Sequence, residues 1–196
     1  MTDRWFLWGL SNGVFVLAIA GGFWFGLAAS ALRPSPATAF VLIVEAALLW
    51  GAFHLRRRAR GFRLSEAKNG DDRQQRLLRQ MVAGFWTATI AQALGITLAV
   101  GICVVAHRVD FIWPAIGLLV SLHFAPLARV FHVPPYYALS VAGSGASLLA
   151  AFDASGPGRI VLLGLTLGTA TWLTAAYLLL RADHLARAAI RELAEA

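Results

Sequence analysis

The sequence predicts an all-α, polytopic membrane protein in which six transmembrane helices form one bundle. Six apolar stretches of about 20 residues or more take up most of the chain, and a helix of that length crosses the ~30 Å of bilayer hydrocarbon. The 196 residues are 59% hydrophobic and 14% charged, whereas soluble domains carry about 25% charged residues. We expect a single domain with spans at about 5–30, 37–55, 82–106, 111–130, 133–152 and 159–180.

The first span ends in a small-residue pattern that also occurs at signal-peptidase sites, Ala29-Ser30-Ala31. The apolar stretch before it is about 25 residues long, however, whereas the apolar region of a signal peptide has about 7–15. Only Arg4 gives this N-terminus a basic side chain. We therefore predict that the first span is retained and that the second follows it after a short polar gap.

The loop 56–80 carries a basic run whose arginines are Arg56, Arg57, Arg58 and Arg60. Two interpretations stay open. The arginines bind anionic lipid head groups, at about 1 kcal/mol each near the surface, or they only keep the loop on the cytoplasmic side. Further along, arginines alternate with apolar residues at helical spacing, so we expect 71–80 to extend the third span.

The last three spans differ in composition. In span 111–130, Pro126 removes a backbone donor and is expected to kink the helix or free a carbonyl. Span 133–152 is the least apolar, and its small residues either pack closely against a neighbouring helix or line a watery cavity. They are Ser140, Gly143, Ser144, Gly145 and Ser147. After span 159–180, the tail 181–196 alternates charged and apolar residues, which predicts a helical continuation along the lipid head groups.

The basic residues predict the orientation of the bundle. Of the 17 Lys and Arg residues, 14 fall on one predicted face, and only Arg33, Arg108 and Arg159 fall on the other. Because cytoplasmic loops are enriched in Lys and Arg, we expect both termini in the cytoplasm. This distribution accounts for the net charge of +7 without a nucleic acid as partner.

Two ionisable side chains lie deep in predicted spans, where charge is costly and each such residue is a functional candidate. Glu45 is about 15 Å deep, near the bilayer midplane. It is either a proton- or cation-linked site or a protonated carboxyl bonded to a neighbouring helix. His123 is ~10 Å deep and either exchanges protons or is a neutral imidazole bonded to a backbone carbonyl. Leu122 offers such a carbonyl, because Pro126 removes its amide donor.

Two amides complete the deep polar set. Asn12 and Gln92 lie at depths similar to those of Glu45 and His123, and amides there commonly hydrogen-bond across helices. Since the four residues come from four different spans, they form a small polar pocket in the cytoplasmic half if those spans converge. Such a pocket would bind or relay a small solute or a proton.

The end of the fourth span and the start of the fifth contain four candidate supporting residues, Pro126, Arg129, Tyr136 and Tyr137. Arg129 reaches the cytoplasmic interface, and the tyrosines fit an interfacial belt. The stretch His123-Phe124-Ala125-Pro126-Leu127-Ala128 is followed by the tyrosine pair and by Gly143. It resembles a motif of bacterial multi-span membrane proteins without an assigned activity, HF-x-P-x-A with a Tyr-Tyr pair and a Gly downstream. The resemblance covers about an eighth of the chain and implies a bacterial membrane family, but it supplies no reaction. We expect the protein in the bacterial inner membrane.

Known catalytic patterns are absent from the sequence. It contains no H-E-x-x-H, G-x-S-x-G, P-loop or C-x-x-C motif, so we expect no metal or cofactor, and an enzyme is the less favoured class. Two function classes stay open: a protein that binds or transports a small solute or proton, and a scaffold that packs a partner or lipid. The sequence also leaves a homo-oligomer open.

Overall fold

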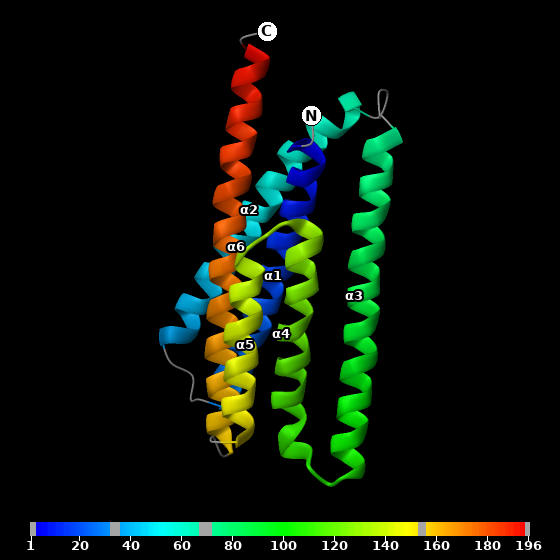
Figure 1. Cartoon of the computed structure of the whole chain (residues 1–196). Helices are drawn as coiled ribbons and strands as arrows, with labels where there is room; N and C mark the ends of the chain where they lie inside the picture. The colour runs from blue at the N-terminus through cyan, green and yellow to red at the C-terminus, as the bar shows by residue number, and fades with distance from the viewer. Residues whose placement is uncertain (1–2, 32–35, 67–71, 153–155, 195–196) are drawn as a thin grey trace.

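The computed structural model describes residues 3–31, 36–66, 72–152 and 156–194. Over these ranges the chain forms six α-helices and one short 3-10 helix, and no strand. The helices are α1 (Asp3–Ala31), α2 (Pro36–Glu66), α3 (Asp72–Val105), η1 (Val109–Phe111), α4 (Ile112–Phe131), α5 (Pro135–Phe152) and α6 (Pro157–Ala194), arranged as in Figure 1. The predicted all-α class is confirmed.

Five of the six described α-helices are long and apolar enough to cross a membrane. These five segments lie in α1, α2, α3, α4 and α6. The exception is α5, whose 18 residues rise by about 27 Å and include the serines and glycines noted in the sequence. The helical membrane class is therefore supported, and the sixth span stays a prediction.

Three helices extend well past the apolar segments. The second continues to Glu66, so the first part of the predicted loop 56–80 is helical, because the arginine-rich run carries on the helix of the second span instead of ending it. The third helix begins at Asp72, as the predicted extension of the third span requires, while Asp71 lies outside the described residues. The sixth continues as one helix to Ala194, and its C-terminal part projects past the ends of its neighbours (Figure 1). The predicted helical tail is thus present, and its position along lipid head groups stays a prediction.

The centre of the bundle is the pair α1 and α6, which make the most extensive helix contact. Their backbones approach closely because α6 presents glycines to α1. A Cβ at Gly164 would lie 2.6 Å from the Cβ of Ala28, and one at Gly168 would lie 2.7 Å from the ring of Phe25. Small residues of this kind let membrane helices pack by van der Waals contact, where no hydrophobic effect drives them together.

The antiparallel pair α4 and α5 packs through a reciprocal arrangement of glycine and serine. A Cβ at Gly117 of α4 would lie 2.7 Å from Ser147 Oγ of α5, and Gly143 of α5 meets Ser121 Oγ of α4 in the same way. Each hydroxyl donates to the carbonyl of the glycine four residues earlier, at 2.7 Å. Close packing therefore accounts for this part of the least apolar helix.

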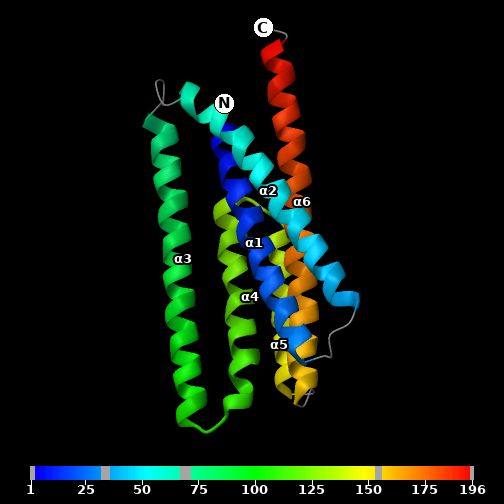
Figure 2. The same cartoon turned by 180° about the vertical axis from the view of Figure 1, so that it is seen from behind.

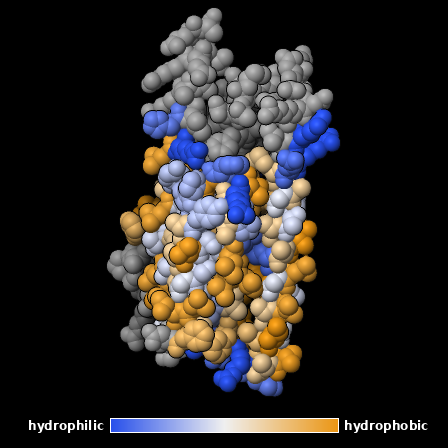
Figure 3. Space-filling model, viewed as in Figure 1, coloured by the Kyte–Doolittle hydropathy of each residue, from blue (hydrophilic) through white to orange (hydrophobic). Residues whose placement is uncertain are grey.

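The outer helices attach to opposite sides of this centre. In Figure 2, α2 crosses α1 obliquely, and it also touches α6. Within the described ranges, α3 packs mainly on α4, with a smaller contact to η1, and side chains such as Leu94 and Leu98 are 66% exposed. On the face in Figure 3, apolar residues dominate the middle and hydrophilic ones gather mostly toward the ends. Contiguous apolar surface of this kind is typical of a surface that contacts lipid.

Candidate functional site

The Glu45 carboxyl lies where α2 meets both α1 and α6. The indole Nε1–H of Trp172, on α6, donates to Glu45 Oε2 at 3.0 Å. The same indole lies 3.4 Å from the carbonyl oxygen of Ala18 on α1. Trp172 is buried and Glu45 is half-buried, so one donor links three helices at the carboxyl.

Two consecutive glycines of α1 make room for this arrangement. A Cβ at Gly22 would lie 2.8 Å from the carboxyl carbon of Glu45, and a Cβ at Gly21 would overlap the indole of Trp172. The carboxyl and its donor therefore rest directly against the α1 backbone. No ion pair involves Glu45 within the described part of the chain, and no second hydrogen bond to its carboxyl is present there.

His123 lies at a different interface, between α4 and α3. Its Nδ1 is 3.1 Å from the carbonyl oxygen of Ala88, and because a carbonyl can only accept, Nδ1 carries the hydrogen. The carbonyl partner is therefore Ala88 on the neighbouring helix, not Leu122 on its own helix, because the ring points across to α3. Gly84 and Gly95 of α3 likewise face side chains of α4, so the two helices are close along this length.

The two deep amides make no side-chain hydrogen bond among the described residues. Gln92 follows Ala88 by one helical turn, which places it on the same side of α3 as the bond from His123. Asn12 precedes Gly13, whose missing side chain leaves room for the Tyr136 hydroxyl. Both amides are half-buried.

The four predicted residues are thus only partly brought together. His123 bonds across the α3–α4 interface to Ala88, one helical turn from Gln92 on α3, whereas Glu45 lies at the junction of α2 with α1 and α6. The two ionisable groups occupy separate places, because the outer helices α2 and α3 pack on different partners. The structure does not bring the four side chains together in a single pocket.

The supporting residues have different surroundings from one another. The fourth helix continues through Pro126 to Phe131 as one helix, with Arg129 in its last turn, and both side chains are exposed. Tyr137 is 45% exposed, as an interfacial residue requires, but Tyr136 is only 6% exposed. The ring centroid of Tyr136 is 5.5 Å from that of Phe124, so Tyr136 belongs to the core rather than to a belt.

Trp172, the hydrogen-bond donor to Glu45, was not among the residues predicted from the sequence. Its position could have indicated this role. Tryptophans in membrane proteins concentrate at the interfaces, whereas Trp172 is far from both predicted ends of its span. A buried indole N–H usually finds an acceptor, and Glu45 was the acidic candidate at that depth.

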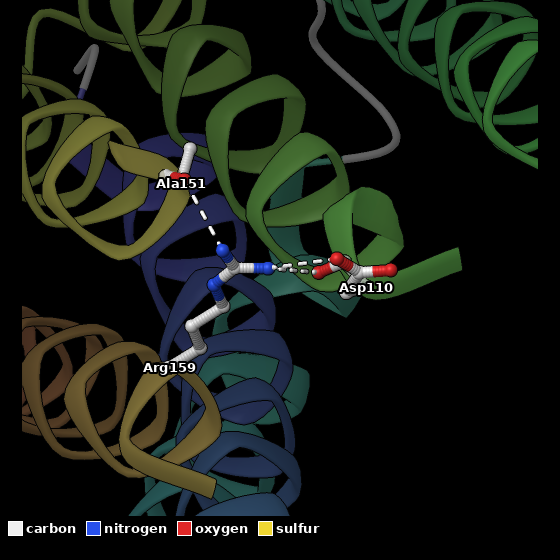
Figure 4. A network of polar contacts seen from close by, with 3 residues as sticks. All are labelled: Asp110, Ala151 and Arg159. Carbon is white, nitrogen blue, oxygen red and sulfur yellow. Dashed lines mark hydrogen bonds and ion pairs between the residues drawn. The ribbon is translucent and has the colours of Figure 1, made fainter. Parts of the chain in front are cut away.

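A polar network outside the deep set joins the helix ends at the end of the bundle away from the termini (Figure 4). The Arg159 guanidinium donates to the backbone oxygen and to Oδ2 of Asp110, at 3.3 and 3.4 Å. It also donates to the Ala151 carbonyl at 3.5 Å and lies 4.9 Å from the ring centroid of Phe111. Arg159 thus connects α6 to the ends of α5 and η1.

In comparisons with known proteins, no family model, no curated protein and no solved structure matches this chain. The resemblance around His123 therefore stays a prediction. In the part of the chain that the structure describes, no three His, Cys, Asp or Glu side chains come together as a metal site.

Proposed function

We propose that this integral membrane protein binds and releases a proton or a small cation at Glu45, in the course of moving a small solute or the proton itself. The observation that carries the proposal is the contact of the carboxyl with the Trp172 indole and the Gly22 backbone, without a cationic partner among the described residues. Intramembrane carboxyls in this situation mark ion and proton pathways by default.

The indole N–H suits both states of such a site. As a donor without acceptor capacity, it stabilises the carboxylate by a charge-assisted hydrogen bond. When the carboxyl is protonated, the same N–H can keep its alternative acceptor, the Ala18 carbonyl at 3.4 Å. The donor therefore has a partner whether the proton is bound or has left, so neither state leaves a buried N–H unsatisfied.

We also propose the finer topology in which α5 is the sixth span and both termini face the cytoplasm of a bacterial inner membrane. An even number of spans requires both ends on one side, and the termini lie at the same end of the bundle in Figure 1. The biased distribution of Lys and Arg supports the cytoplasmic assignment.

Anionic lipids are proposed as partners of the basic run. The guanidinium carbon of Arg56 is 5.9 Å from the ring centroid of Phe15, and that of Arg57 is 5.8 Å from the ring of Phe53. These positions hold the charges beside the apolar body of the bundle, within the range of cation–π attraction. The side chains of Arg58 and Arg60 lie outside the described residues.

The competing function is a scaffold whose deep polar groups only hold helices together. The observation that favours it is that His123 and Glu45 each hydrogen-bond a group on a neighbouring helix. Interhelical bonds of this kind contribute about 0.6–2 kcal/mol to membrane proteins, so such residues are retained for stability alone. A homo-oligomer remains compatible with both functions.

Proton flux separates the two functions. The purified protein is reconstituted into liposomes that contain a pH-sensitive dye, and the internal pH is followed after a membrane potential is imposed. We expect a flux that the Glu45→Gln variant loses and that Asp110→Asn, which removes a carboxyl at the end of the bundle, keeps. An equal flux in wild type, Glu45→Gln and protein-free liposomes contradicts the proposal and favours the scaffold.

A further inference from the structure

The α3–α4 interface holds two hydrogen-bonding groups that the fold leaves unused. The Nδ1–H of His123 is committed to the Ala88 carbonyl, so in the neutral ring Nε2 is an acceptor. No described residue donates to Nε2, and the Gln92 amide, one turn from Ala88, makes no side-chain hydrogen bond within the described ranges. The unpaired Nε2 of His123, an acceptor, and the unpaired amide of Gln92, which can donate and accept, therefore both lie at this interface.

These groups are reachable from outside the bundle. Among the polar atoms of the described side chains, only Ser144 Oγ is both inaccessible from the surface and without a hydrogen-bond partner. The unpaired atoms of His123 and Gln92 therefore keep some accessible surface, and both residues are half-buried. Because α3 packs mainly on α4, its other flanks are open to lipid, and a molecule dissolved in the bilayer has lateral access to this interface.

The surroundings are apolar and aromatic. The rings of Phe85 on α3 and Phe131 on α4 meet edge-on with centroids 6.2 Å apart, near the cytoplasmic side of the bond from His123. Leu119 and Val130 of α4 face Gly95 and Gly84 of α3. Aromatic edges favour a ring-shaped ligand through edge-to-face contacts, and a few polar groups in an apolar wall are typical of small-molecule sites.

We propose that the α3–α4 interface, at His123 and Gln92, binds a lipid-soluble phenol or quinol-type molecule that enters from the bilayer. The ligand hydroxyl donates to His123 Nε2, and its oxygen accepts from the Gln92 amide. One hydroxyl thus uses both unpaired groups, while the ring contacts aromatic side chains and the alkyl chain stays in lipid. This site is independent of Glu45, which lies on a different helix junction.

The experiment compares 4-nonylphenol with its methyl ether, 4-nonylanisole, on protein in lipid nanodiscs. Ligands that bind only the folded protein raise the Tm as their concentration rises, so titration gives an apparent Kd. The ether keeps the ring, the chain and an oxygen that accepts from Gln92, but it cannot donate to His123. We expect the ether to bind about tenfold more weakly than the phenol, as for loss of one buried hydrogen bond.

The variants locate the site. In Gln92→Leu we expect the phenol to bind about tenfold more weakly, and in His123→Leu the phenol and the ether should bind equally. The matched control is Asn12→Leu, which removes a half-buried amide from α1 and should keep the wild-type preference, as should Glu45→Gln. His123→Leu also loses the bond to Ala88. If that variant does not fold, the binding of the phenol to Gln92→Leu is the deciding measurement. Equal binding of phenol and ether to the wild type, or unchanged phenol binding in Gln92→Leu, overturns the proposal.

Discussion

The indole of Trp172 donates to the Glu45 carboxyl across 3.0 Å and so ties α6 to α2. These residues are 127 positions apart in the chain. The contact depends on α1, because Gly21 and Gly22 admit the indole and the carboxyl against its backbone. The junction of three helices, rather than any single span, defines the site.

Trp172→Phe should lower the free energy of unfolding by more than a loss of packing alone. The substitution removes the donor to Glu45 and leaves that carboxyl without its hydrogen bond, which costs about 1–3 kcal/mol for a buried polar group. The matched control is Trp24→Phe, since Trp24 is also buried and its indole donates no hydrogen bond to a described residue. Equal losses in the two variants, measured by reversible unfolding in detergent, would mean that the bond to Glu45 adds nothing.

Gly22→Ala should destabilise the protein, because the new Cβ would lie 2.8 Å from the carboxyl carbon of Glu45 and must displace it. Gly26→Ala, one turn further along α1, is the control, since its Cβ meets nothing within 4 Å. Alanine there should be neutral or gain up to about 1 kcal/mol from helix propensity. Thermal unfolding of both variants checks this difference, and a Gly22→Ala protein as stable as Gly26→Ala would contradict the described packing of Glu45.

Ser144→Ala should raise the free energy of unfolding by about 1 kcal/mol. Its Oγ is buried and has no hydrogen-bond partner among the described residues, and such a group loses its hydration without compensation. Ser147→Ala is the comparison, because Ser147 Oγ donates to the Gly143 carbonyl and its removal should give no gain. A destabilised Ser144→Ala would contradict this prediction, because it would mean that a hydrogen bond compensates for the burial of the hydroxyl.

Asp110→Asn should cost less than about 1 kcal/mol, because the carboxylate is 59% exposed and exposed ion pairs contribute little. Arg159→Met should cost more, since it also removes the bonds to two backbone carbonyls and the contact with Phe111. Unfolding at low and high salt tests this ranking: salt should reduce the effect of Asp110→Asn more than that of Arg159→Met. The reverse ranking of the two variants would show that the ion pair, not the carbonyl bonds, holds the helix ends.

The sequence predicted the helical membrane class because hydrocarbon imposes a simple length rule on apolar segments. It also singled out Glu45 and His123 as candidates, since ionisable groups in such segments are rare. It did not predict their partners. Whether Glu45 meets His123 or Trp172 depends on how α2 packs around the bundle, and a periodic apolar sequence does not encode which helix its polar face meets.

The two tyrosines show the same limit at the scale of one residue. Both fit an interfacial belt from their position at the start of α5, but consecutive residues on a helix point about 100° apart. Tyr137 therefore faces outward, whereas Tyr136 packs on Phe124. The position of each tyrosine along the helix was predictable, but the direction of its side chain required the packing of α5 on α4.

The most direct test of the central claim, that Glu45 exchanges a proton inside the membrane, is infrared difference spectroscopy of the protein in lipid bilayers as a function of pH. Beyond the bands of the other Asp and Glu side chains, we predict a carboxylic acid C=O band that titrates in the wild type, changes frequency in Trp172→Phe because its hydrogen bond is lost, and is missing from Glu45→Gln. A wild-type difference spectrum without such a band, or the same band in Glu45→Gln, would contradict the account.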